Sequence, residues 1–453
     1  MKSKEKSNLF ENFLLLFILL SAIATLIIYI YFSFKRYFIG DDFPLLLSAK
    51  NLKSIFHPLG PHFRPIVRAH FLLSNIFGDS PVFFNFLSLI LHLFATVSLY
   101  LVLKEEYNKK FSLFTSLIFF SLFAYNEAIF WVSSVGVVYS LLFSLLSIYY
   151  TRKEKYFLSV IFLLLSSFSY ETWLVLPLYF LLSKKRSITL IISSITLLGF
   201  HSLFALFSSE KILSYGGFPP LDEIPLRILY YFYKNLFPFS YLSKGIFLTI
   251  GFLTFIALSL YSLIKYREKF LLPFLFYFVP SAIFLMSKYI PSRFFYFPLV
   301  SIATLLSCSI FKKKPWRYLS LPFIIYLSIL SPVINYLDGL DYLEYSKLHR
   351  VFIDEGRRLM KDLKAGDKVV IVNRVSLPMP EIAENSVKGR PKLFLHRWRG
   401  IGGLIDLNVF TNFIFWEKGM KSTPIPGGKD CKIIIIGNGD FVSEYSFKVE
   451  EIK

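Results

Sequence analysis

Apolar runs of about 18–25 residues recur along most of this chain, and few folds accommodate them. As helices, such runs match the hydrocarbon thickness of a bilayer, about 30 Å. The chain has 453 residues, of which 55% are hydrophobic, and a soluble domain sits at roughly 45–50% on a similar count. We therefore predict an all-α polytopic membrane protein. Eleven spans are expected, at roughly 9–33, 82–103, 111–124, 128–150, 156–168, 170–183, 187–207, 245–264, 270–287, 293–311 and 317–334.

The positive charge is distributed unevenly between the gaps that separate these runs. The net charge is +20, and Lys and Arg gather in alternate gaps, at 104–110, 151–155, 183–186, 265–269 and 311–317. The gaps at 125–127, 169–171 and 287–293 carry far fewer cations. Cytoplasmic loops carry the Lys/Arg excess, so the pattern predicts a cytoplasmic N-terminus and an extracytoplasmic C-terminus. The charge therefore reflects topology and not nucleic-acid binding.

Two long external segments and a C-terminal region interrupt the apolar pattern. The external loops are expected at 35–81 and 208–243, within a membrane domain that covers 1–337. From 338 to 453 a helical pattern ending near Gly366 precedes short β-rich runs, which predicts a small extracytoplasmic α/β domain. The 2 cysteines give no disulfide framework. The lack of Gln and the scarcity of Met and Cys are typical of a thermophile.

Ionisable residues at the ends of the apolar runs fall almost entirely on the predicted outer side. Such residues are costly in a membrane and are usually paired or functional. Their clustering on one side predicts a single outward-facing site, built from Asp41, Asp42, Glu127, Glu171, Lys288 and Arg293. The short spans beside Glu127 and Glu171 would leave a recessed cavity there.

Each of these residues also has a plainer explanation. Asp41 and Asp42 could form a solvated cap after the first span, and the two glutamates could stabilise helix N-termini. Arg293 could extend along the membrane to the interface. His92, inside an apolar run, could be an interhelical hydrogen-bonding residue.

Five short motifs, in order along the chain, carry a family resemblance. They are FIGDDFPLL (38–46), FRP followed by FGDSPVFFNFLSLILHLF (63–65 and 77–94), NEAIFW (126–131), YETWLVLPLYFLL (170–182) and SRFFYFP (292–298). Their order and spacing resemble the membrane half of the transmembrane, tetratricopeptide-containing O-mannosyltransferases. They resemble more loosely the protein O-mannosyltransferases and the aminoarabinose transferases, all of the GT-C superfamily. Asn85 and Ser88 depart from that pattern, Tyr170 replaces its usual Lys, and the tetratricopeptide tail is absent.

The resemblance implies an integral-membrane glycosyltransferase of GT-C-like fold. Such enzymes transfer a sugar from a polyprenyl-phosphate donor to an extracytoplasmic acceptor, which here could be a protein, a lipid or a glycan. No cofactor and no metal site are implied, although a divalent metal is not excluded, and the partners are the donor lipid and the acceptor.

The chemistry assigns a role to each candidate residue. An attacking hydroxyl needs a general base, and crowding two carboxylates raises the pKa of one. The leaving phosphate needs fixed cations, for which the planar guanidinium is well suited. We expect Asp41 as base with Asp42 in support; Arg293, Arg64 and Lys288 on the phosphate; and Glu127, Glu171 and His92 on sugar or acceptor hydroxyls. Alternatively, the two glutamates pair with Arg64 or Arg293 and shape the pocket.

Two other functions fit a polytopic chain of this kind. A transporter or flippase for lipid-linked glycans would be expected to have mid-membrane charges and internal repeats, and neither is found. An O-antigen-type polymerase or ligase would share the outward-facing cations but would not need the Asp pair.

Overall fold

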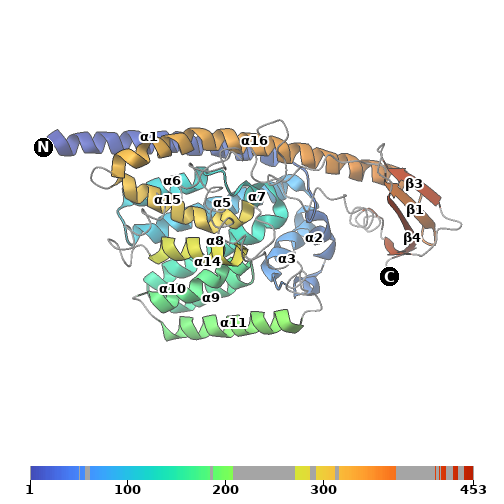
Figure 1. Ribbon diagram of the computed structural model, residues 1–453. Helices are drawn as coiled ribbons and strands as arrows, with labels where there is room; N and C mark the ends of the chain where they lie inside the picture. Colours follow the sequence, from blue (N-terminus) through green and yellow to red (C-terminus); the bar gives the residue numbers. More distant parts are fainter. Residues whose placement is uncertain are drawn as a thin grey trace, which may run out of the picture.

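The computed structural model describes residues 2–49, 51–56, 62–183, 187–207, 271–285, 292–311, 316–373, 414, 418, 420–424, 432–436 and 443–451. Within these ranges the chain forms a bundle of helices with a small β-sheet beyond one end (Figure 1). The predicted second external loop, the span expected at 245–264 and Lys288 lie outside the described residues.

Most of the predicted spans are helices in the structure. The helices of the bundle are α1 (Lys2–Lys35), α5 (Pro81–Lys104), α6 (Lys109–Ser121), α8 (Val135–Arg152), α9 (Tyr156–Ser167), α10 (Val175–Leu182), α11 (Ile188–Phe207), α14 (Leu271–Leu285), α15 (Tyr296–Ile310) and α16 (Trp316–Leu359). Among the described residues, 6 helical segments are long and apolar enough to cross a membrane. The chain is therefore a predominantly helical polytopic membrane protein, and the total of eleven spans stays a prediction.

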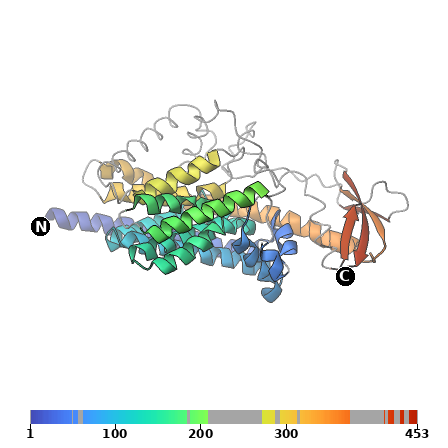
Figure 2. The ribbon, with the colours of Figure 1, turned by 90° about the horizontal axis from the view of Figure 1, so that it is seen from below.

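Some of the helices are too short to cross a bilayer on their own. At 1.5 Å per residue, the 12 residues of α9 span about 18 Å, well below the 30 Å of a hydrocarbon core. The short helix α9 lies beside the longer α11 in the bundle (Figure 2). A recessed cavity above them stays a prediction.

One end of the bundle is built from short elements. These are α2 (Asp42–Ser48), η1 (Leu52–Phe56), α3 (Pro65–Leu72), α4 (Ser74–Phe77), α7 (Asn126–Phe130) and the 3-10 turns η2 (Val132–Ser134), η3 (Glu171–Leu174) and η8 (Ser292–Phe295). The segment predicted as the first external loop therefore forms short helices. Phe43, Phe71 and Phe84 are fully buried in the core that holds them together.

The last helix is longer than the sequence pattern indicates. Helix α16 lies parallel to α1, as the pairs Thr25–Asn335 and Phe32–Gly339 show, and it continues past the bundle to the sheet (Figure 1). A Cβ atom on Gly339 would lie 2.2 Å from the Phe32 ring, so the two helices are in close contact there. The predicted boundary at 337/338 falls inside this single 44-residue helix. No proline interrupts it between Pro332 and its end, so the last span and the amphipathic helix after it are continuous.

The sheet has four strands in the order β2-β4-β1-β3. Its strands are β1 (Lys368–Asn373), β2 (Met420–Pro424), β3 (Lys432–Ile436) and β4 (Ser443–Glu451). Strand β1 is parallel to β3, with Val370 opposite Ile433, and antiparallel to β4, which is antiparallel to β2. Three of the strands lie in runs that the sequence marks as β-rich. The extent of a separate C-terminal domain stays a prediction.

Candidate active site

The two adjacent aspartates lie in different environments. Gly40, at φ 50°, turns the chain after α1, which leaves the Asp41 side chain exposed and the Asp42 side chain buried. The Asp42 carboxylate accepts hydrogen bonds from the backbone N–H groups of Ile39 (3.0 Å) and Ser133 (2.7 Å). Asp42 therefore anchors its own loop to η2, and Asp41 is the acid that a substrate can reach.

The pKa values of the two acids respond to these surroundings. Burial raises the pKa of Asp42 to about 8, against the two backbone hydrogen bonds, which lower it. The pKa of Asp41 is raised as well. Desolvation by the surrounding protein raises it, and the positive charge of Arg293 partly offsets this effect. A raised pKa makes Asp41 a better proton acceptor than an ordinary surface aspartate.

Two further side chains fix the loop that carries these acids. The Trp131 indole N–H donates to the Ile39 carbonyl oxygen at 3.1 Å. The buried Arg36 guanidinium donates to the carbonyl oxygens of Phe32, at 3.3 Å, and Phe130. These bonds satisfy one carbonyl group in the last turn of α1 and one at the end of α7, and so they hold the two helix ends together.

A buried ion pair joins Glu127 on α7 to Arg293 on η8. The Glu127 side chain is 0% exposed and that of Arg293 is 12% exposed, so the carboxylate depends on this partner. The backbone reinforces the contact in both directions. The Arg293 N–H donates to the Glu127 carboxylate at 3.4 Å, and the Glu127 N–H donates to the Ser292 hydroxyl at 3.1 Å. The Arg293 guanidinium also lies over the Trp131 ring, 5.2 Å from its centre.

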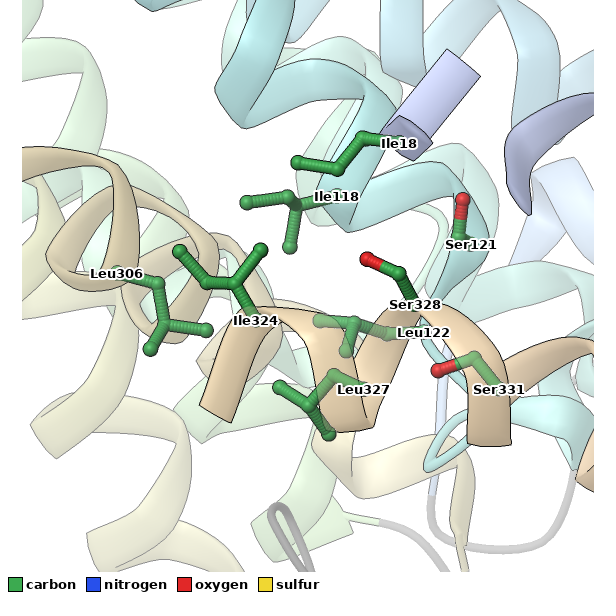
Figure 3. Close-up of a pocket in the computed structure, with 9 residues that line it drawn as sticks. All are labelled: Ile18, Ile118, Ser121, Leu122, Leu306, Ile324, Leu327, Ser328 and Ser331. Carbon is green, nitrogen blue, oxygen red and sulfur yellow. The ribbon is translucent and has the colours of Figure 1, made fainter. Parts of the chain in front are cut away.

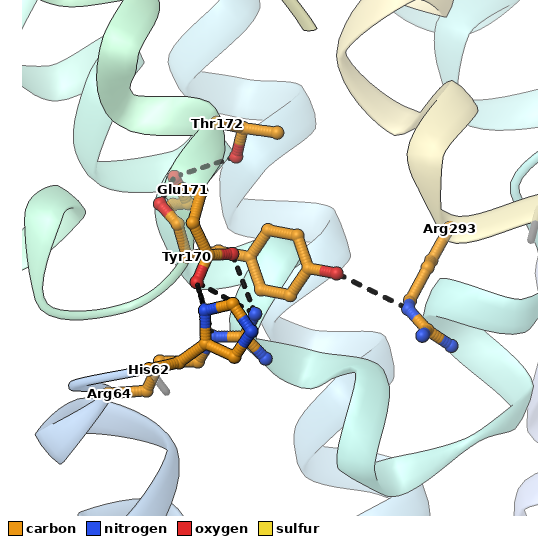
Figure 4. A network of polar contacts seen from close by, with 7 residues as sticks. His62, Arg64, Tyr170, Glu171, Thr172 and Arg293 are labelled. Carbon is orange, nitrogen blue, oxygen red and sulfur yellow. Dashed lines mark hydrogen bonds and ion pairs between the residues drawn. The ribbon is translucent and has the colours of Figure 1, made fainter. Parts of the chain in front are cut away.

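Arg64 and Glu171 form a second ion pair, which Figure 4 shows together with Arg293 of the first pair. Arg64 donates from Nε and one terminal nitrogen to the Glu171 carboxylate, at 3.0, 2.8 and 2.6 Å. His62 Nδ1 lies 2.6 Å from the same carboxylate. This is a bidentate arrangement, which fixes the direction as well as the distance of the pair.

Tyr170 connects the two ion pairs. Its ring lies under the Arg64 guanidinium, 4.2 Å from Cζ, and its hydroxyl accepts from Arg293 Nε at 3.4 Å. The turn that carries Tyr170 packs closely on α8 at Gly136, where a Cβ atom would lie 2.9 Å from the Ser169 carbonyl oxygen. A residue with a side chain would displace this turn, so Gly136 fixes the place of Tyr170.

The structure brings most of the predicted site residues together at one end of the bundle. Each glutamate is paired with an arginine, which is the second of the two arrangements expected from the sequence, and Asp41 interacts electrostatically with Arg293. His92 lies elsewhere, fully buried in α5. Its ring nitrogens lie 2.7 Å from the Tyr296 hydroxyl and 3.0 Å from that of Tyr125. His92 thus links helices, and among the residues that the structure describes its hydrogen-bond partners belong to neither ion pair.

Several residues of the site were not expected from the sequence. They are Arg36, His62, Trp131, Ser133 and Tyr170, each of which contacts an acid or an arginine of the site or the backbone of the segments that carry them. The one available signal was Tyr170, because it stands where the resembling family has Lys. The others act through backbone groups or distant partners, which a single sequence does not reveal.

Two other features of the described chain do not belong to this site. A small pocket lies between α1, α6, α15 and α16 (Figure 3), and its lining is aliphatic apart from Ser121, Ser328 and Ser331. It has no ionisable side chain, so it offers no acid–base chemistry. Among the residues that the structure describes, no group of three or more His, Cys, Asp or Glu is placed to hold a metal ion.

Comparison with known proteins gives a likeness to solved structures and none to a known sequence family. No family model matches the sequence, and no curated protein matches it. The fold is similar to the crystal structure of ArnT from Cupriavidus metallidurans bound to undecaprenyl phosphate, with a TM-score of 0.49 and 9% sequence identity. The match covers 80% of this chain and 82% of that one.

Proposed function

We propose that this chain is an integral-membrane glycosyltransferase that transfers a sugar from a polyprenyl-phosphate donor to an extracytoplasmic acceptor. One observation carries the proposal. Residues from four separate motifs, at 41, 127, 170–171 and 293, meet at one end of an all-helical membrane bundle. These are motifs that resemble the GT-C enzymes. In this arrangement the accessible acid Asp41 interacts electrostatically with Arg293, and Tyr170 contacts both Arg293 and Arg64.

In this proposal Asp41 is the general base. Its carboxylate takes the proton from an acceptor hydroxyl as the oxygen of that hydroxyl attacks the anomeric carbon. The bond from that carbon to the lipid phosphate breaks at the same time, and the phosphate leaves with the bonding electrons. Asp42 keeps its side chain buried and positions Asp41 through the short loop that they share.

Arg293 and Arg64 stabilise the negative charge that grows on the leaving phosphate. A guanidinium has five N–H donors, so an arginine that is held by a carboxylate can still donate to a phosphate oxygen. The paired glutamates fix the direction of each cation before the substrate arrives, which is the arrangement that stabilises a transition state without reorganisation. Lys288 stays a candidate for the same role.

The first test is to identify the lipid that the protein binds. The purified protein would be analysed by native mass spectrometry, with extraction of its lipids, for a co-purifying polyprenyl phosphate or its sugar adduct. A sugar adduct would supply the donor for a transfer assay in membranes, in which Asp41→Asn should be inactive. Full transfer by both Asp41→Asn and Asp42→Asn would rule out the mechanism. A polyprenyl diphosphate that carries a long glycan would point to the polymerase or flippase alternatives.

A further inference from the structure

A chain of buried polar side chains includes Asn126, the neighbour of Glu127 on α7, and has no part in the proposed chemistry. The Tyr29 hydroxyl, on α1, donates to Asn126 Oδ1 at 3.0 Å. Asn126 Nδ2, on α7, donates to the carboxylate of Asp338, on α16, at 2.7 Å. All three side chains are buried, and Asp338 is only 2% exposed.

A buried carboxylate is an expensive way to hold two helices together. Desolvation of a charge costs several kcal/mol, and apolar residues of similar volume often pack at least as well. A hydrogen bond between a carboxylate and an amide has a direction, however, which an apolar contact lacks. Asn126 accepts on its oxygen and donates from its nitrogen, so the orientation of this side chain is fixed by Tyr29 and Asp338 together.

The segment held in this way carries the buried acid of the site. Helix α7 has only 5 residues, too few to be stable as a helix without its tertiary contacts. Asn126 is its first residue and Glu127 its second. The direction of the Glu127 side chain toward Arg293 therefore depends on how Asn126 is held.

Helix α16, which carries Asp338, also contacts the segment that carries the two aspartates. One side of α16 packs on α1 at Gly339, and ten residues later the His349 ring stacks on Phe43, with centres 6.3 Å apart and planes at 11°. Phe43 is the residue after Asp42. Helix α16 thus contacts α7 and α1 at positions 338 and 339, and α2 at position 349.

We propose that Asp338 is a positioning residue, which holds α7 through Asn126 and so orients Glu127 and Arg293 for the reaction. The inference rests on the proposed function for the importance of that ion pair. The position of α7 can be measured without any substrate, so the two proposals can fail separately.

The experiment uses the full-length protein in detergent or nanodiscs, with hydrogen–deuterium exchange over residues 126–131 as the first readout. Asp338→Ala should increase exchange there at least tenfold and lower kcat for transfer at least tenfold, with a smaller effect on KM. Asn126→Asp alone should do the same, because it places two carboxylates side by side. The double variant Asn126→Asp with Asp338→Asn reverses donor and acceptor, and it should restore both readouts to within about threefold of the parent.

A matched control lies one turn earlier on the same helix. Asn335 is equally buried and donates to the Ser121 carbonyl oxygen at 3.1 Å, but this bond leads to α6 and not to α7. Asn335→Ala should leave exchange at 126–131 and kcat as in the parent.

Each outcome decides the question. Exchange at 126–131 that is unchanged in Asp338→Ala, or that rises equally in Asn335→Ala, would overturn the proposal. If Asp338→Ala does not fold, the double variant decides alone: protected α7 supports the proposal, and loose α7 or failure to fold overturns it. If the parent shows no transfer, the exchange measurement still tests Asp338, and only the proposed function is lost.

Discussion

Removal of Arg293 should destabilise the protein more than removal of the carboxylate to which it is bound. Arg293→Met leaves the Glu127 carboxylate, which is 0% exposed, without its cation. Glu127→Gln leaves an arginine that is 12% exposed and that still contacts Tyr170 and the Trp131 ring. The difference in burial therefore predicts an asymmetry between two variants that break the same bond.

The size of the effect follows from the burial of each partner. An uncompensated buried charge costs about 3–5 kcal/mol, whereas a broken hydrogen bond with a neutral replacement costs about 1–3 kcal/mol. Melting temperature falls by about 2–4 °C per kcal/mol in chains of 150–250 residues, and by about half of that in one of this length. We expect Arg293→Met to lower the apparent melting temperature by about 3–10 °C, and Glu127→Gln by about 1–6 °C. In the double variant Glu127→Gln with Arg293→Met, the loss should be smaller than in Arg293→Met alone.

The assay is a thermal-unfolding scan of the purified variants in one detergent at one heating rate. Retention of helical circular dichroism at low temperature is the control for correct folding. Equal losses in the two single variants, or a double variant with the sum of both losses, would refute the reasoning. Either result would mean that the two side chains contribute independently and that the burial of Glu127 creates no dependence on Arg293.

The remaining predictions concern single residues of the same site. Asp41→Asn should lower the transfer rate by about 10²–10⁴-fold with unchanged thermal stability, because it removes an exposed base. Burial raises the pKa of Asp42 from 3.8 to about 8, so the folded state keeps a proton that the unfolded state releases. Stability should therefore fall between about pH 4 and pH 8, and a melting series in Asp42→Asn should lack this slope. Tyr170→Phe removes one hydrogen bond to an arginine and keeps the ring, so transfer should fall about fivefold, or about 1 kcal/mol, in a kinetic assay. Gly136→Ala places a methyl group against the Ser169 carbonyl oxygen, and it should cost about 1–3 kcal/mol in a thermal scan.

These predictions have internal controls. Unimpaired transfer by Asp41→Asn would mean that another group is the base. A pH slope that is unchanged in Asp42→Asn would place its source elsewhere. For Gly136→Ala, Gly199→Ala is the matched control, because a Cβ atom there has no neighbour within 4 Å and the same substitution should be tolerated.

The helices were predictable where one strong local signal defines them. The span expected at 82–103 is α5, and its start follows from Ser80, whose side chain accepts from the Phe83 N–H at 3.4 Å, and from Pro81 in the first turn. Hydropathy fails where the tertiary structure overrides it. The single span expected at 128–150 contains the end of α7, the turn η2 and α8, because the backbone at Ser133 leaves the helix to bind Asp42.

The sequence indicated which residues belong to the candidate site, but it did not indicate which acid is bound to which arginine. A carboxylate or arginine at the end of an apolar run is visible in the sequence, and Asp41, Glu127, Glu171 and Arg293 were all marked in this way. Which acid meets which cation depends on the packing of segments that are more than 100 positions apart, as for Arg64 and Glu171. A single sequence contains no information on such distances.

Asp338 shows why the supporting residues were missed. It lies just after the last apolar run, where a change in composition suggests the start of a soluble region. In the structure it is instead part of the bundle, because α16 continues through that position and its partner Asn126 lies 212 positions earlier. A change to a more polar composition therefore does not show where a helix leaves the bundle if one face of that helix stays buried.

Because α16 is continuous from the bundle to the sheet, the number of residues in it determines the direction in which the sheet faces. With 44 residues at 1.5 Å each, the helix is about 66 Å long, roughly twice the thickness of a hydrocarbon core. Each residue advances the helix by about 100°, so one residue inserted after His349 would swing the sheet through more than a quarter turn about the helix axis. Seven inserted residues, close to two full turns, would return it nearly to its original heading while moving it about 10 Å farther along the helix axis. Chains related to this one should therefore tolerate length changes in this helix in steps of about seven residues and reject steps of one or two.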